Sequence, residues 1–275
     1  MPKQVLITKA DGQEQLFDPF KLEHSLERAG ASSLVRARIT GRVVEGLKPG
    51  TTTAEIYRHA FELLRHEGVH PLAARYSIKR AVFDLGPSGF PFEQFISEVL
   101  RGHGWSTRTD QMVTGRCAEH EVDVVAEKDG RRIGIEAKFH NEPGGKTDIK
   151  DALYVYARYE DLSRSAHSRT RIDEGWLVTN TSFTINAIHY AECANLRLLS
   201  WDYPREKNLF AMIEEANVHP LTCLTTLSES EKHRMLEQRV VLCKSILAPH
   251  TLEQYGIKPD RIPQVIEEAR ALCAS

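Results

Sequence analysis

The chain has 275 residues, of which 41% are hydrophobic and 27% are charged, and its formal net charge at pH 7 is −2. These values are typical of a globular protein with one large domain or two of ordinary size. No apolar run reaches the roughly 18 residues of a membrane-spanning helix, and the N-terminus lacks the apolar core of a signal peptide. We therefore expect a cytoplasmic protein with no membrane partner.

The cysteines are widely separated, and no Cys-x-x-Cys pair occurs, so neither a zinc ribbon nor a disulfide framework is indicated. We expect each to be a small buried residue in a reducing compartment. They are Cys117, Cys193, Cys223, Cys243 and Cys273.

The N-terminal residues predict a β-hairpin followed by helices. Apolar runs at 5–9 and 15–18 flank Asp11-Gly12, a dipeptide that favours a hairpin turn. Three helices are predicted to begin near Pro19, Thr53 and Pro71. One face of the first helix is expected to carry Phe20, Leu22 and Leu26.

This order resembles the ATP-cone, the small nucleotide-sensing domain of ribonucleotide reductases and their repressors, over about residues 3–88. That family binds a triphosphate with a Lys-Arg pair before the hairpin turn. Lys9 matches the Lys, but Ala10 stands in place of the Arg, and Gln15 stands where a Glu is common. The resemblance implies that ATP or dATP binds at Lys9, Lys21 and Thr53. Loss of the bidentate Arg contact predicts a weakened affinity, and the alternative is a cone kept only for docking or dimerisation.

Helix breakers at residues 86–91 (Gly-Pro-Ser-Gly-Phe-Pro) predict a linker after this region. A helix is then predicted from Phe92-Glu93 to about Gly102, because apolar residues recur at helical spacing. These residues are Phe95, Ile96, Val99 and Leu100.

A second hairpin carries the chemistry. Residues 122–125 and 133–138 are apolar runs joined by the turn-forming stretch 127–130. Because side chains alternate along a strand, Glu136 and Lys138 share one face, and Asp123 on the neighbouring strand is expected to join them. Two carboxylates and an amine at one point are what metal-dependent phosphodiester hydrolysis needs, since carboxylates hold a hard cation and a lysine stabilises charge on the phosphate. The alternative is a solvated hairpin with ordinary surface charges.

Further elements are predicted along the chain: a helix over 149–159, a strand over 175–179, a helix through 187–191 and a strand over 196–199. With the hairpin, the order α-β-β-β-α-β-α-β resembles the PD-(D/E)xK or restriction-endonuclease-like nucleases, in their Mrr-like and Holliday-junction-resolvase-like branch. The resemblance covers about residues 90–205. It implies that Asp123, Glu136 and Glu93 ligate Mg²⁺ or Mn²⁺, that Lys138 assists catalysis, and that DNA is the substrate.

Additional DNA contacts are expected from His140, which shares the face of Glu136, and from the basic stretch 163–171. This stretch contains Arg164, Arg169 and Arg171 and no acidic residue. Arginine and hydroxyl side chains of this kind contact phosphates in many interfaces. A solvated loop is the alternative.

The last part of the chain predicts a helical tail. Ser228 and Glu231 have capping-box spacing at the start of one helix, and Gly256-Ile257 weakly resembles the phosphate-binding step of a helix-hairpin-helix. A lid or dimerisation tail is the alternative for this region.

The predicted fold class is α/β, with an N-terminal α+β ATP-cone (1–88), a central restriction-endonuclease-like mixed sheet flanked by helices (90–205) and a C-terminal helical tail (220–275). The predicted function is a Mg²⁺-dependent DNA endonuclease, gated by ATP or dATP and acting as a homodimer. The alternatives are a non-cleaving nucleotide-sensing DNA-binding regulator and an interaction module without a nucleic-acid role.

Overall fold

The computed structural model describes residues 5–9, 12–66, 70–167 and 171–273. The N-terminal part has a two-stranded hairpin and five helices. Its elements are β1 (Leu6–Thr8), β2 (Glu14–Leu16), α1 (Pro19–Arg28), α2 (Ser33–Gly46), α3 (Thr53–His66), α4 (His70–Tyr76) and α5 (Ile78–Phe83). The hairpin and the three predicted helix starts are confirmed, whereas α2 was not predicted.

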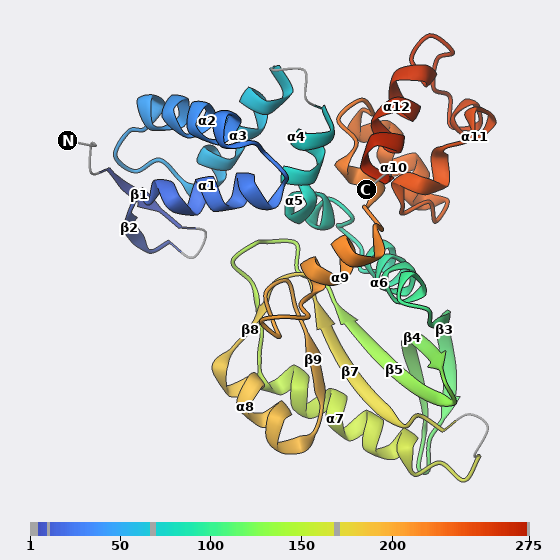
Figure 1. Cartoon of the computed structure of the whole chain (residues 1–275). Helices are drawn as coiled ribbons and strands as arrows, with labels where there is room; N and C mark the ends of the chain where they lie inside the picture. The colour runs from blue at the N-terminus through green and yellow to red at the C-terminus, as the bar shows by residue number, and fades with distance from the viewer. Residues whose placement is uncertain (1–4, 10–11, 67–69, 168–170, 274–275) are drawn as a thin grey trace.

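The central part is a five-stranded mixed sheet in the order β3-β4-β5-β7-β9, with β3, β4 and β5 antiparallel and β5, β7 and β9 parallel (Figure 1). Its elements are α6 (Phe90–Gly102), β3 (Ser106–Thr114), β4 (Glu119–Lys128), β5 (Arg131–Lys138), α7 (Ile149–Ser163), β7 (Glu174–Thr179), α8 (Ile185–Ala194) and β9 (Arg197–Leu199). This order confirms the predicted one. Two short strands, β6 (Lys146–Thr147) and β8 (Ser182–Phe183), pair with each other.

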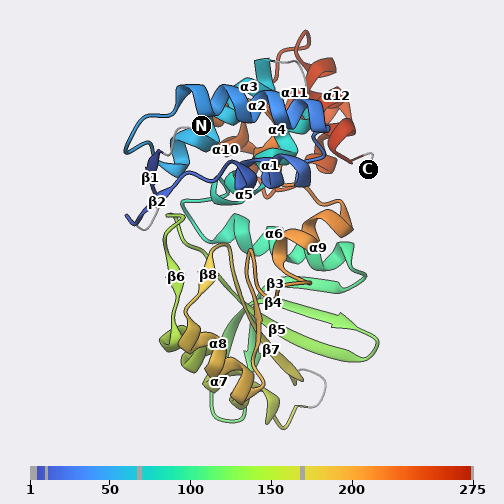
Figure 2. The ribbon, with the colours of Figure 1, turned by 60° about the vertical axis from the view of Figure 1, so that its left-hand side comes forward.

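Helices cover both faces of this sheet (Figure 2). On one face α6 buries Phe92 and Phe95 against Ile133 and Ile135 of β5, as the odd-numbered positions of a buried strand require. On the other face α7 and α8 pack against β7 and β9. The even-numbered positions of β5, which include Glu136 and Lys138, therefore face α7.

Two glycines fix the position of α7 on the sheet. Gly134 and Gly175 are paired neighbours in β5 and β7, and the ring of Tyr159 lies directly on both. An added Cβ at either glycine would come within 2.3 Å of that ring. The absence of side chains at these two positions lets α7 approach closely, and it sets which α7 residues lie beside Glu136.

The C-terminal part consists of α9 (Leu209–Ala216), α10 (Glu229–Glu237), α11 (Pro249–Gln254) and α12 (Ile262–Cys273), with the short 3₁₀ helices η1 (Leu221–Cys223) and η2 (Cys243–Ile246). The predicted capping box is confirmed, because the Ser228 hydroxyl accepts from the Glu231 amide and the Glu231 carboxylate accepts from the Ser228 amide. The Gly256 and Ile257 amides donate to carbonyl groups of α11, so they are not available to a phosphate.

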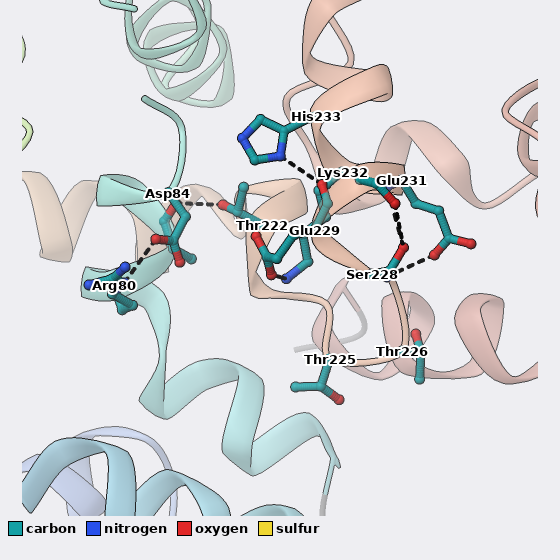
Figure 3. Close-up of polar contacts among 12 residues, drawn as sticks. Arg80, Asp84, Thr222, Thr225, Thr226, Ser228, Glu229, Glu231, Lys232 and His233 are labelled. Carbon is teal, nitrogen blue, oxygen red and sulfur yellow. Dashed lines mark hydrogen bonds and ion pairs between the residues drawn. The ribbon is translucent and has the colours of Figure 1, made fainter. Parts of the chain in front are cut away.

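The C-terminal part packs on the N-terminal helices, as Figure 3 shows around Arg80, Asp84 and Thr222. The Thr222 hydroxyl donates to the Ala81 carbonyl of α5, and α12 contacts α4. One hydrophobic core runs from Ala74 and Leu85 through α6 and the sheet to Leu272. The predicted break at 86–91 covers the connection after α5 and the first two residues of α6, and the preceding Leu85 is buried in this core. The domain bounds themselves remain a prediction.

Three expectations about burial are wrong. Phe20 is 78% exposed, because at about 100° per residue it lies about 160° round the helix from Leu22 and about 120° from Leu26. Cys117 and Cys193 are exposed rather than buried, since each lies on an outward position of a turn or helix.

Among the described residues, no helix is both long and apolar enough to cross a bilayer.

Candidate active site

A fork between two strands creates the candidate active site. β4 and β5 pair from Val124 opposite Ile135 to Lys128 opposite Arg131. Beyond Val124 the backbones separate, and the Asp123 carboxylate takes over by accepting the Ala137 amide hydrogen at 2.7 Å. β5 continues to pair with β7 as far as Lys138, whereas its pairing with β4 ends at Val124. The gap between β4 and β5 beyond that point is the fork.

Three carboxylates meet at this fork from three elements. Burial and then the neighbouring Asp123 raise the pKa of Glu136 to about 7. Glu93, in the first turn of α6, also has a pKa raised to about 7, by burial and then by Asp123. Burial raises the pKa of Asp123 as well, although the Ala137 amide and Arg158 oppose the shift. Asp110 and Glu121 add further negative charge, so the fork favours a bound cation.

Lys138 forms an ion pair with Asp151 of α7, with 3.1 Å between Nζ and Oδ1. Its charge also opposes the rise in the pKa of Glu136, which places the amine near that carboxylate. Asp151 was missed by the sequence analysis. It lies in the first turn of α7, three residues after the helix cap at Asp148.

Glu136 forms an ion pair with Arg158 of α7, a second residue that the sequence analysis missed. The i, i+7 spacing of Asp151 and Arg158 puts them on one face of α7, which is the signal that could have found both. Tyr154, on the same helix, is 62% exposed. Its hydroxyl accepts from the Arg158 guanidinium.

Within the described ranges, no group of three or more His, Cys, Asp or Glu side chains stands close enough together to enclose a metal ion. The donor set nevertheless suits a hard divalent cation, because it consists of partly buried carboxylates, and Asp123 raises the pKa of both Glu93 and Glu136. In this arrangement the Glu136 carboxylate is directed at the Arg158 guanidinium.

His140 lies in a polar network behind the fork. Its ring Nε2 is 2.9 Å from the Thr147 hydroxyl, and its backbone exchanges two hydrogen bonds with the Asn180 side chain. Burial and then Lys138 lower the pKa of His140. The network ties the loop after β5 to the end of β7, so His140 supports the site from a fixed position.

The arginines of the basic stretch 163–171 lie in different parts of the structure. Arg164 pairs with Glu160 one turn earlier in α7, and Arg171 lies 3.7 Å from Asp173. Asp173 accepts from the Arg132 amide at the start of β5, so Arg171 lies at the end of that strand away from Lys138. Six residues of strand separate these ends, about 20 Å, and Arg171 is therefore not beside the fork. Arg169 lies outside the described residues.

The predicted nucleotide residues come from three elements. A β-bridge joins Thr8 to Thr52, which brings the segments carrying Lys9 and Thr53 together. Lys21 is exposed in the first turn of α1. The helix cap at α3 is made by Thr52 with Glu55 rather than by Thr53. Ala10 lies outside the described residues.

Comparison with known proteins identifies the class of the central part. Residues 87–203 match the family model described as restriction endonuclease, and residues 219–273 match the model described as AF1548-like, C-terminal. The central part is therefore a restriction-endonuclease-like domain, with the mixed sheet and flanking helices described above, and the match supports a nuclease.

The full chain belongs to the AF1548-like family. An uncharacterized protein of Archaeoglobus fulgidus is 33% identical over 177 residues, which are 64% of this chain and 98% of that protein. The crystal structure of AF1548, a protein of unknown function, is 31% identical, with a TM-score of 0.57 over 68% of this chain and 100% of that one. A repair endonuclease from Pyrococcus abyssi is 20% identical, with a TM-score of 0.32 over 41% of this chain and 46% of that one, too low to carry an argument.

Proposed function

We propose that the protein is a metal-dependent DNA endonuclease. The observation that carries the proposal is the fork of β4 and β5, where Asp123 and Glu136 lie together with Lys138 inside a restriction-endonuclease-like domain. Burial and neighbouring negative charge raise the pKa values of these carboxylates, so a nearby positive charge would stabilise their ionised form. A divalent cation bound between the protein and a DNA phosphate would supply that positive charge.

The residues that would hold Mg²⁺ or Mn²⁺ are Asp123 and Glu136, with the carbonyl of Ala137, while Glu93 would bind a second ion or orient a water. A bound ion of this kind supplies an activated water and offsets charge on the phosphate. Lys138 would orient the attacking water and stabilise the charge that develops on the phosphate oxygens. Asp151 would hold the Lys138 amine in place through their ion pair.

An endonuclease that cuts both strands of a duplex needs two active sites, so we propose that the active form is a homodimer. The second candidate function is a non-cleaving, nucleotide-sensing DNA-binding regulator built on the same chain. Both candidates require DNA as a partner, and only the first requires a metal for its activity.

We propose in addition that the N-terminal part is an ATP-cone-like domain that binds ATP or dATP near Lys9, Lys21 and Thr53. The bridge between Thr8 and Thr52 supports this proposal, because it draws the β1 end and the α3 start together. A nucleotide there could act on the fork only by favouring one arrangement of the domains. The core that continues from Ala74 in α4 into α6 is a physical route for such coupling.

The test is incubation of the purified full-length chain with labelled duplex, four-way junction and single-stranded DNA, with Mg²⁺, with Mn²⁺ and with excess EDTA. Cleavage of at least one substrate only when the metal is present supports the endonuclease. Binding without cleavage under all conditions supports the regulator instead. Absence of binding to every DNA contradicts both.

A further inference from the structure

The guanidinium of Arg158 is held firmly beside the fork. It comes from α7, next in sequence to Tyr159, whose ring lies on Gly134 and Gly175. That packing determines how α7 sits on the sheet and therefore that Arg158 faces Glu136. The side chains of Arg158 and Glu136 are only 12% and 20% exposed, so the pair is largely screened from water.

Three contacts orient this guanidinium. Nη1 donates to the Glu136 carboxylate and, at 3.1 Å, to the Glu121 carbonyl. Nη2 donates to the Tyr154 hydroxyl at 2.8 Å, and the guanidinium carbon lies 4.8 Å from the centre of the Tyr154 ring. Within the described part of the chain, the buried Nε has no hydrogen-bond partner, so the group is not at its best hydrogen-bonding position.

The pairing decides what Glu136 can do. The Glu136 Oε2 atom accepts from Arg158, so a metal ion that approaches this oxygen meets the positive charge of the guanidinium and competes with it for the carboxylate. Among the described residues, no three acidic, His or Cys side chains are assembled as a ligand group, although Asp123 raises the pKa of both Glu93 and Glu136. Lys138 is paired with Asp151, whereas Arg158 pairs directly with Glu136.

We infer that Arg158 is an internal counter-cation that occupies Glu136 in the metal-free protein, and that a divalent cation binds by displacing this guanidinium from the carboxylate. The inference rests on the proposed metal-dependent function and adds a competitor to it. In this role Arg158 holds the Glu136 carboxylate and neutralises its charge until a divalent ion binds. Its charge then opposes that of the incoming ion and sets the concentration at which the site fills.

The test is calorimetric titration of MnCl₂ into the full-length protein, without DNA, for the wild type and for Arg158→Met. Methionine keeps most of the side-chain length and removes the charge. The expected result is tighter Mn²⁺ binding by about tenfold, because a like charge within hydrogen-bonding range of the ligand is removed. The melting temperature in EDTA should fall, because Glu136 is left buried without its partner, and the rise on adding Mn²⁺ should grow.

Two variants serve as controls. Arg164→Met removes the arginine at the C-terminal cap of α7, which pairs with Glu160 away from the fork, and should leave Mn²⁺ affinity unchanged. Asp123→Ala should abolish Mn²⁺ binding in either background. Where Arg158→Met does not fold, Tyr154→Phe replaces it: loss of the hydroxyl that anchors Nη2 should tighten Mn²⁺ binding by about twofold.

The outcomes separate the two levels of the proposal. If Mn²⁺ binds the wild type but binds Arg158→Met, or its substitute Tyr154→Phe, no more tightly, the counter-cation inference is overturned while the metal site stands. If the wild type binds no Mn²⁺ at millimolar concentration, both the metal-dependent function and the inference fall. Tighter binding in the variant, with an unchanged Arg164→Met control, supports the inference.

Discussion

The central fork and the N-terminal nucleotide residues differ in how their charges are held. At the fork, the carboxylates are partly buried, and Asp123 raises the pKa of both Glu93 and Glu136. Two α7 side chains, Asp151 and Arg158, pair with residues of β5. In the N-terminal part, Lys21 is exposed, and Lys9 follows a three-residue strand. The comparison teaches that a packed sheet can hold charged side chains together before any ligand arrives, whereas the residues proposed to bind a nucleotide lie on exposed or short elements.

The largest expected effect is at the fork. Asp123→Ala, Glu136→Ala and Lys138→Ala should each reduce DNA cleavage by roughly two decades or more, because each removes a ligand or a charge that stabilises the reacting phosphate. Rates on labelled DNA with saturating Mg²⁺ measure the effect. Glu127→Ala is the matched control, since this carboxylate lies at the other end of β4, paired with Arg132. Full activity in all three fork variants would show that the chemistry lies elsewhere.

The next effect concerns the N-terminal part. Ala10→Arg would restore the Lys-Arg pair of the resembling family and should tighten ATP or dATP binding by up to about a hundredfold, since one bidentate phosphate contact contributes roughly 1–3 kcal/mol. Calorimetry with each nucleotide measures it. Lys9→Ala and Lys21→Ala should weaken binding, and Lys48→Ala, a lysine before α3, is the control. Unchanged affinity in both variants would mean that the nucleotide binds at another place.

A packing variant tests how the fork is built. Gly134→Ala should lower the free energy of unfolding by about 1–3 kcal/mol, because its methyl group would meet the Tyr159 ring at 2.3 Å. Urea denaturation measures this. Gly41→Ala is the matched control, as a Cβ there meets nothing within 4 Å inside α2, and should be neutral or slightly stabilising. Equal stability of the two variants would refute the close approach of α7.

The smallest effect is the pH dependence of stability. Glu93 and Glu136 have folded-state pKa values of about 7, above their ordinary 4.5. Each therefore favours folding fully below about pH 4.5, and that contribution is lost as the pH rises through about 7. The melting temperature in EDTA should fall over this window, and the Glu93→Gln/Glu136→Gln double variant should show a shallower fall. The same slope in both proteins would contradict the coupling.

Local patterns predicted much of the fold. The alternation in 133–138 indicated a strand whose Glu136 and Lys138 share a face, and both now lie toward α7. The Ser228–Glu231 spacing predicted its helix start, because a cap depends only on neighbouring residues. Phe20 was misplaced because three apolar residues were assigned to one face without regard to their angles, and α2 was missed because its apolar face is weakly marked in the sequence.

By itself, then, the sequence determined most of the elements, the order of those in the central part and the candidate residues Glu93, Asp123, Glu136 and Lys138, since periodicity and turn chemistry act over a few residues. The tertiary structure alone decided that β4 leaves β5 at Asp123 and that Asp151 and Arg158 reach the fork. It also decided that the C-terminal helices share a core with α4 and α5. These features depend on how α7 rests on two glycines and on which distant apolar faces meet, and no short stretch of sequence carries that information.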